Sequence, residues 1–351
     1  MFLRSKRERL RSWLAYLITL VCLTTMTPVR TMAWGSAGHQ VTALIAYALL
    51  TPRAQNNVRA VLGSKNIIDV ATWPDDLKRA GEGCVIPGMK VCNPNYRPET
   101  AQWHFVDMPI SGDGRFDLHA EYCRPSRYGD CIVPAIEDFR GILNRSTKRA
   151  FASNGDEQKR KLHDALSFVV HFLGDLHQPL HCADNNDSGG NSVLVSWKDE
   201  PKYKYDDIWN LHSVWDEYLV ERNIMMMEQE KRTSNRYAES LFKKLSEAER
   251  NYAQLKSSSI EAGHAENVIA WAEGSHVLAK TSTYKLPSKT VKTSSRGFQK
   301  KDRDGNPMDI IILDEKYFTD HMPEVERQLR RGGVRLARIL NEIYDKDIPS
   351  K

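Results

Sequence analysis

The segment from Leu162 to Leu176 constrains the fold most strongly, because apolar residues would occupy nearly every face of a helix with this sequence. A helix without a wide polar face has to lie in the centre of the protein. His171 and Asp175 nevertheless stand four residues apart on this segment, so they share one face. Burying an unpaired imidazole or carboxylate costs several kcal/mol. The segment therefore predicts a central helix whose polar pair has a compensating partner.

Other segments also predict helices. Val41 to Leu50 forms one helical pattern, and Thr51-Pro52 marks the start of a second that runs to Leu62. Near the end of the chain, apolar residues from Val325 to Ile343 follow helical spacing, and Gly332-Gly333 permits close packing there. We therefore expect an all-α fold.

Three stretches interrupt the helical pattern. Gly81 to Thr100 and Ile110 to Asp130 have the composition of long loops, and Ser192 to Ser196 predicts a short strand. Thr283 to Glu315 is rich in Lys and Ser before the apolar run Ile310 to Leu313, which predicts an exposed insertion, either a loop or a hairpin. No linker divides the chain, so we expect one mainly helical domain over residues 34–351, with long loops and one or two short hairpins.

The N-terminus has the features of a secretory signal peptide over residues 1–33. A basic region from Arg4 to Arg11 precedes an apolar stretch, and Thr31-Met32-Ala33 resembles a cleavage site. Cleavage would make Trp34 the first residue of a secreted or periplasmic protein without a membrane span; the alternative is an uncleaved signal anchor. Six of the 50 basic residues but only one of the 45 acidic residues precede Trp34. The rest of the chain is balanced in charge, which excludes a generally cationic surface for binding polyanions.

The cysteines agree with export. Cys84 and Cys92, and likewise Cys123 and Cys131, are close together in loop-like sequence, so two local disulfides are the most economical pairing. Cys182 is then left over, and we expect it to be a buried thiol.

A second set of polar residues repeats the spacing of the central helix. His212 and Asp216 are four residues apart, and His181 follows the helix-ending Pro179. One such pair is most simply a hydrogen-bonded His–Asp pair. Two pairs and a further histidine favour a metal site, and mixed imidazole and carboxylate ligands suit zinc better than calcium or magnesium.

Taken in order, these motifs resemble the zinc-dependent type I nucleases, which are single-strand-preferring nucleases and 3'-nucleotidases in the same fold superfamily as zinc phospholipase C. The resemblance runs from Trp34 to Asn341 and rests on Trp34-Gly-Ser-Ala-Gly-His39, Ala71-Thr-Trp-Pro-Asp75, Trp103-His-Phe-Val-Asp107, His171-Phe-Leu-Gly-Asp175-Leu-His-Gln-Pro-Leu-His181, Gly189-Gly-Asn191, Asn210-Leu-His-Ser-Val-Trp-Asp216, Ala270-Trp-Ala-Glu273 and Gly332-Gly-Val-Arg-Leu-Ala337. Pro74 departs from the family pattern, in which Ala is frequent, and the insertion at Thr283 to Glu315 has no assigned role.

The resemblance implies a trinuclear zinc cluster. Its implied ligands are Asp75, His104 and His171 for one ion; Asp175, shared with that ion, together with His39 and the free amino group and carbonyl of Trp34 for a second; and His181, His212 and Asp216 for the third. An amino group becomes available as a ligand only after cleavage and deprotonation, so removal of the signal peptide would complete the site.

The implied reaction is hydrolysis of single-stranded DNA, RNA and 3'-nucleotides to 5'-mononucleotides or nucleosides. Metal-activated water would attack phosphorus, and a zinc ion would stabilise the leaving 3'-oxygen. By resemblance Asp107 orients or deprotonates the water, or else supports a ligand through a hydrogen bond. Lys78 would pair with phosphate or remain a solvated surface lysine. Phe105 would stack on a base or pack in the core, and Asn191 would lie in the base pocket.

Two other functions fit parts of this pattern. Zinc phospholipase C shares the N-terminal Trp and the metal cluster, but usually has Glu where this chain has Asp216. A non-catalytic secreted protein whose fold is held together by zinc is the alternative outside enzymes. We expect a monomer that needs no protein partner.

Overall fold

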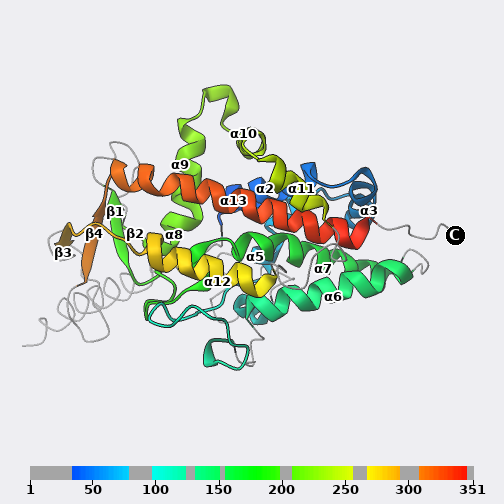
Figure 1. The fold of residues 1–351 in the computed structure, drawn as a ribbon, viewed down its shortest axis with the longest axis horizontal. Coiled ribbons are helices and arrows are strands. Elements are labelled where there is room, and N and C mark those ends of the chain that lie inside the picture. The colour runs from blue at the N-terminus through cyan, green and yellow to red at the C-terminus, as the bar shows by residue number, and fades with distance from the viewer. Residues whose placement is uncertain are drawn as a thin grey trace, which may run out of the picture. The chain divides into compact units, whose positions relative to one another are not determined.

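A computed structural model describes residues 34–78, 97–123, 131–150, 155–197, 208–255, 267–292 and 308–345, all within one unit, Met32–Lys351. These residues are mainly helical, as predicted (Figure 1). The α-helices are α2 (Ser36–Ala48), α3 (Pro52–Leu62), α4 (Ile67–Ala71), α5 (Trp73–Leu77), α6 (Ile132–Ala150), α7 (Asp156–Asp175), α8 (Leu211–Ser213), α9 (Leu219–Met226), α10 (Ser234–Lys243), α11 (Glu247–Gln254), α12 (Val268–Leu278) and α13 (Glu315–Tyr344). Short 3-10 turns are η1 (Pro98–His104), η2 (Glu121–Cys123), η3 (Pro179–Cys182) and η5 (Gln229–Lys231), and π-helical turns are η4 (Val214–Tyr218) and η7 (Ala279–Thr283).

The predicted helices near the N-terminus are confirmed. The hydroxyl of Thr51 accepts a hydrogen bond from the amide of Ala54 at 3.1 Å, and Pro52 occupies the first turn of α3, where its missing amide hydrogen costs nothing. Helix α2 starts at Ser36, before the predicted Val41, so His39 is its fourth residue and lies at the end of its first turn.

Helix α7 is central, as its sequence predicts. Every residue from Ala165 to Asp175 is buried, and the helix contacts α2, α3, α4, α5, α6 and α13. Phe168 stacks on Phe139 of α6 with ring centroids 4.4 Å apart. Helices therefore surround the polar pair His171 and Asp175, and the groups that neutralise this pair have to come from within the protein.

Helix α13 packs along α2 and α7 (Figure 1). It starts at Glu315, where the side chain of Asp314 accepts the amide hydrogen of Tyr317. The paired glycines permit the close contact with α2, because a Cβ atom on Gly333 would lie 2.6 Å from Cγ2 of Ile45. A Cβ atom on Gly332 would lie 3.1 Å from Cγ2 of Thr42.

A four-stranded sheet with strand order β2-β1-β4-β3 joins distant parts of the chain. Its strands are β1 (Leu194–Trp197), β2 (Trp209–Asn210), β3 (Thr290–Lys292) and β4 (Asp309–Leu313). β1 is the strand expected at Ser192 to Ser196, displaced by one or two residues, and the antiparallel β3–β4 pair matches the hairpin expected in the insertion. The parallel pairing of β1 with β4 was not predicted, and it buries Ile310 and Leu313 in a segment that we expected to be exposed.

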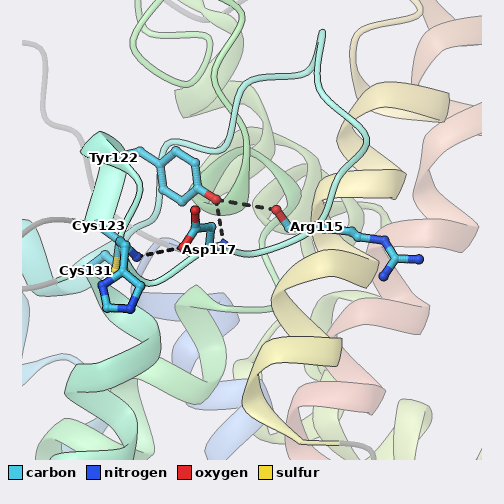
Figure 2. Close-up of a disulfide and its surroundings, with 6 residues drawn as sticks. Arg115, Asp117, Tyr122, Cys123 and Cys131 are labelled. Carbon is cyan, nitrogen blue, oxygen red and sulfur yellow. Dashed lines mark hydrogen bonds between the residues drawn. A yellow bond between two sulfur atoms is a disulfide. The ribbon is translucent and has the colours of Figure 1, made fainter.

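The structure contains the predicted disulfide between Cys123 and Cys131, which joins η2 to the start of α6. Figure 2 shows the loop before it, where the hydroxyl of Tyr122 accepts from the amide of Asp117 at 2.8 Å and donates to the carbonyl of Arg115 at 3.4 Å. Cys182 is buried with a free thiol, as expected. The predicted pair Cys84 and Cys92 lies outside the described residues.

Among the described residues, no helix is both long enough and apolar enough to cross a lipid bilayer. The predicted signal peptide, residues 1–33, lies outside the part of the chain that the structure describes.

Two glycine substitutions test the packing of α13 on α2. Gly333→Ala places a methyl group 2.6 Å from Ile45 and 3.0 Å from the carbonyl oxygen of Thr42. We expect it to lower the free energy of unfolding by about 1–3 kcal/mol, because the two helices must move apart. The matched control is Gly274→Ala in α12, where the new Cβ has no atom within 4 Å. This exposed change should stabilise the protein by up to about 1 kcal/mol. Urea unfolding of both variants measures the difference, and equal effects would contradict the proposed packing role of Gly333.

Candidate metal centre

Eight imidazole and carboxylate side chains converge from seven elements of the fold. All are between 0 and 6% exposed. They are His39 of α2, Asp75 of α5, His104 of η1, His171 and Asp175 of α7, His181 of η3, His212 of α8 and Asp216 of η4. The structure thus brings together all the side chains that the sequence predicts as ligands, in groups whose donor atoms lie within 4.8 Å of one another.

The first cluster is arranged around Asp175. Its Oδ2 lies 2.9 Å from Nδ1 of His104 and 3.1 Å from Nε2 of His171, while its Oδ1 lies 3.2 Å from Nε2 of His39. Asp75 completes the cluster, with Oδ1 3.6 Å from Nε2 of His171 and 3.8 Å from Nδ1 of His104. The two oxygens of Asp175 therefore face different histidines, which is the arrangement of a bridging carboxylate.

The second cluster consists of His181, His212 and Asp216. Nε2 of His212 lies 3.2 Å from Oδ2 of Asp216, and Nε2 of His181 lies 3.7 Å from Oδ1 of the same carboxylate. The two Nε2 atoms are 3.1 Å apart. The amide side chain of Gln178 donates to Oδ1 of Asp216 at 2.5 Å, which fixes the orientation of that carboxylate.

Backbone carbonyls orient three of these imidazoles. Nδ1 of His171 is 2.7 Å from the carbonyl of Ala71, Nδ1 of His181 is 2.8 Å from that of His104, and Nδ1 of His212 is 2.6 Å from that of Gly189. A carbonyl accepts, so each Nδ1 carries the hydrogen and each neutral ring presents a lone pair at Nε2. Two lone pairs 3.1 Å apart, at His181 and His212, cannot bond each other. Two nitrogen lone pairs that face the same point in this way have the arrangement of two ligands of one cation.

The carboxylates also require positive charge. Burial raises the pKa of Asp175, but His171 and the hydrogen bonds from His104, His171 and His39 outweigh burial and hold the pKa well below its usual value. Burial lowers the pKa of His171, but Asp175 and Asp75 raise it to about 10. Burial and His171 lower the pKa of His39. Without a metal ion, a second proton on His171, at Nε2, therefore supplies the positive charge that keeps these carboxylates ionised; a cation bound there would take the place of that proton.

The donor set fits a transition-metal ion such as zinc. Nδ1 of His39 and Nε2 of His104 are buried and have no hydrogen-bond partner among the described residues. Leaving such groups without a partner is costly, and a cation would satisfy them. Calcium and magnesium prefer shells of oxygen, whereas zinc accepts imidazole nitrogen and carboxylate oxygen together.

Trp34 lies beside the second cluster. Its side chain is fully buried, and the amide of the next residue, Gly35, donates to the carbonyl of Asp216 at 2.6 Å. The hydrogen bond of Gly35 thus holds the adjacent backbone of Trp34 close to Asp216, a predicted ligand. His39 follows on the helix that starts at Ser36. The residues before Trp34 lie outside the described part of the chain.

The predicted catalytic residues occupy different places. Nζ of Lys78 lies 2.7 Å from Oδ1 of Asp75, so Lys78 pairs with a predicted ligand and is not a solvated surface lysine. Asp107 is half-buried; burial and Asp184 raise its pKa to about 6, whereas His212 and His181 lower it. The pKa of Asp107 therefore depends on charges in the second cluster, although Asp107 follows His104 of the first cluster by only three residues.

The predicted base-contacting residues lie at the edge of the core. Phe105 is half-buried, but it does not belong to the aromatic and aliphatic side chains that pack together in the described core. This disfavours core packing as its role. Asn191 donates from Nδ2 to the carbonyl of Ser188 at 2.8 Å, while its Oδ1 is buried without a hydrogen-bond partner among the described residues.

The residues that support the second cluster were not predicted from the sequence. Gln178 lies inside the motif that starts at His171, but we gave it no role. Asp184 and Asp187 form hydrogen bonds that shape the loop presenting the Gly189 carbonyl to His212. A sequence cue exists, since Asp, Asn and Gly crowd between positions 184 and 191, a composition typical of backbone-bonded turns.

Comparison with known proteins agrees with this geometry. Residues 34–345 match the family model of S1/P1 nuclease. Endonuclease 3 of Arabidopsis thaliana is 26% identical over 338 residues, which are 95% of this chain and 96% of that protein. Nuclease P1 of Penicillium citrinum is 25% identical over 332 residues, 90% of this chain and 99% of that protein. Nuclease S1 of Aspergillus oryzae is 26% identical over 317 residues, 89% of this chain and 92% of that protein. A match of this extent, over a chain with two buried His/Asp clusters, shows that the protein belongs to the S1/P1 nuclease family.

Proposed function

We propose that this protein is an exported, zinc-dependent phosphodiesterase that cleaves single-stranded DNA and RNA to 5'-mononucleotides and removes phosphate from 3'-nucleotides. The observation that carries the proposal is the convergence of imidazole lone pairs and carboxylate oxygens in two buried clusters. Membership of the S1/P1 family favours a nuclease over zinc phospholipase C and over a non-catalytic zinc protein.

We assign the donors to three zinc ions. The grouping follows the distances around Asp175 and Asp216. The proposed ligands are Asp75, His104, His171 and Asp175 for the first ion; Asp175, His39 and the amino group and carbonyl of Trp34 for the second; and His181, His212 and Asp216 for the third. Zinc ions in such a site supply Lewis acidity, which activates water and stabilises charge on phosphoryl and leaving oxygens.

Asp107 is the proposed base or water-orienting group. With a pKa near 6, it is largely ionised at neutral pH and remains basic enough to accept a proton. Lys78 is proposed to bind a phosphate oxygen. Its present partner is Asp75, which would receive its positive charge from zinc when the ion is bound, leaving the Lys78 ammonium available to the substrate.

Phe105 and Asn191 are the proposed contacts to a base. A partly exposed ring outside the core offers a stacking surface that every base can use, provided that the base is unpaired. The unpaired Oδ1 of Asn191 offers an acceptor for an N–H group on the base edge. Together they account for a preference for single strands with little sequence selectivity.

A panel of substrates tests the proposed reaction. We expect the mature protein to hydrolyse single-stranded DNA, RNA and 3'-AMP, and not phosphatidylcholine. A chelator should abolish the activity, and zinc but not magnesium should restore it, because the donor set includes imidazole nitrogen. Turnover of phosphatidylcholine alone would establish the phospholipase alternative. Binding of three zinc ions without hydrolysis of any substrate would establish the non-catalytic one.

Two histidines on the same helix test the assignment of the first cluster. His171→Ala removes a proposed ligand and should lower kcat/KM on single-stranded DNA by more than about 100-fold, with loss of bound zinc. The control is His163→Ala, two turns earlier on α7, where the side chain is about a quarter exposed and faces Asp164. Its activity and zinc content should stay near those of the wild type. Equal zinc content in the two variants would exclude His171 as a ligand.

The proposed amino-terminal ligand makes the number of bound zinc ions depend on which residue comes first. A protein that starts at Trp34 should bind three zinc ions, whereas a protein carrying one extra alanine before Trp34 should bind two, because its α-amino group is displaced from Trp34. Elemental analysis combined with N-terminal sequencing measures both quantities. Three ions in the extended protein would contradict the role of the Trp34 amino group.

A further inference from the structure

The start of the insertion at Thr283 to Glu315 contacts the loop beside the second cluster. Tyr284 follows the π-helical turn η7, and its hydroxyl donates to Oδ1 of Asp187 at 2.8 Å. Burial raises the pKa of Tyr284, and the carboxylate of Asp187 raises it further, so the hydroxyl keeps its proton and remains a donor. Oδ2 of Asp187 has no hydrogen-bond partner among the described residues. Among the described residues, the hydrogen bonds to this buried carboxylate are therefore made through Oδ1.

Asp187 shapes a loop of unusual backbone conformation. Its Oδ1 also accepts from the amide of Gly190 at 2.7 Å. Positive φ angles occur at Asn186 (57°), Ser188 (58°), Gly189 (60°) and Gly190 (82°), and this conformation is unfavourable for the two residues that are not glycine. Hydrogen bonds from side chains have to offset that cost.

Asp184 provides the remaining support for the loop. Its Oδ1 accepts from the amides of Asp187 at 3.0 Å and Gly189 at 3.1 Å. The backbone of Gly189 is closely packed, because a Cβ atom there would lie 2.8 Å from the carbonyl oxygen of Leu180 in η3. The two aspartates thus hold the peptide of Gly189 in one position between η3 and α8.

The Gly189 carbonyl is the group that orients His212. It accepts from Nδ1 of His212 at 2.6 Å, which directs Nε2 of that ring toward Asp216 and His181. A displacement of Gly189 would therefore rotate the ring of His212 or break its hydrogen bond. Partners of this kind commonly control the affinity of a metal ligand.

A second set of contacts leads from Tyr284 back to the same motif. The hydroxyl of Tyr317 in α13 donates to the carbonyl of Thr283 at 3.4 Å and accepts from Nε1 of Trp215 at 2.9 Å. Trp215 precedes Asp216 in the π-helical turn η4. The Thr283–Tyr284 segment is therefore connected to both His212 and Asp216.

We propose that Tyr284 is a positioning residue that holds Asp187, and through it the Gly189 carbonyl, so that His212 presents Nε2 to the second cluster. The insertion thereby takes part in forming the site. This inference rests on the proposed function only in treating His212 as a zinc ligand.

The test uses substitutions that keep shape. Tyr284→Phe removes only the hydroxyl, and Asp187→Ala removes the carboxylate. Tyr344→Phe is the matched control, since the Tyr344 ring is also buried and its hydroxyl has no hydrogen-bond partner among the described residues. The readouts are the rate at which a chelator removes zinc from the mature protein and the solvent-exchange rate of the His212 Nδ1 proton, measured by NMR.

For Tyr284→Phe we expect one of the bound zinc ions to leave about tenfold faster than in the wild type and the His212 Nδ1 proton to exchange faster. Asp187→Ala should have a larger effect, and the double variant should match Asp187→Ala, because the hydroxyl acts only through that carboxylate. Tyr344→Phe should behave like the wild type.

Additive effects in the double variant, or a Tyr284→Phe protein indistinguishable from Tyr344→Phe, would overturn the inference. Should Asp187→Ala fail to fold, the exchange rate of the His212 proton in Tyr284→Phe against Tyr344→Phe decides the matter alone. These readouts do not depend on turnover. A wild-type protein that hydrolyses no nucleic acid, but whose variants follow the expected pattern, would therefore disprove the proposed function and support the role of Tyr284.

Discussion

The need of buried carboxylates for positive charge determines how this protein is built. Asp175 lies on the central helix α7, 0% exposed, and keeps its ionised form only because three imidazoles face it. Those imidazoles come from α2, η1 and α7 itself, so these elements must pack around one point. The packing around α7 and its polar centre therefore depend on each other. Apolar residues bury the carboxylate of Asp175, and the imidazoles that face it compensate its charge.

The parts of the fold predicted from sequence are those that depend on local periodicity. The apolar faces of α7 and α13, the Thr51-Pro52 start of α3 and the four-residue spacing of His171 with Asp175 can all be read along the chain. The parallel pairing of β1 with β4 cannot be predicted in this way. These short strands are more than one hundred residues apart, and the sequence of neither strand indicates which strand it pairs with. The same limit applies to Lys78. Its spacing from Asp75 can be read in the sequence, but the burial of the Asp75 carboxylate, which makes the two side chains pair, is visible only in the structure.

Site residues on regular elements were easier to predict than the residues that orient them. His212 and Asp216 share a helix face, whereas Gln178, Asp184 and Asp187 act from turns, where no periodicity indicates direction. Asp107 illustrates a further difficulty. It follows a ligand of the first cluster by three residues, yet the charges that set its pKa include those of the second cluster, His181 and His212. Sequence proximity to one metal group did not predict proximity to the other.

The contact of α13 with α2 has a consequence for biosynthesis. Helix α2 carries His39, while Gly332 and Gly333, against which Thr42 and Ile45 of α2 pack, lie far later in the sequence. The surface of α13 on which α2 packs does not exist until α13 has been synthesised. Helix α2, which carries His39, therefore reaches its final packing only after α13 has been made, and a chain truncated before Glu315 would lack the surface on which α2 packs.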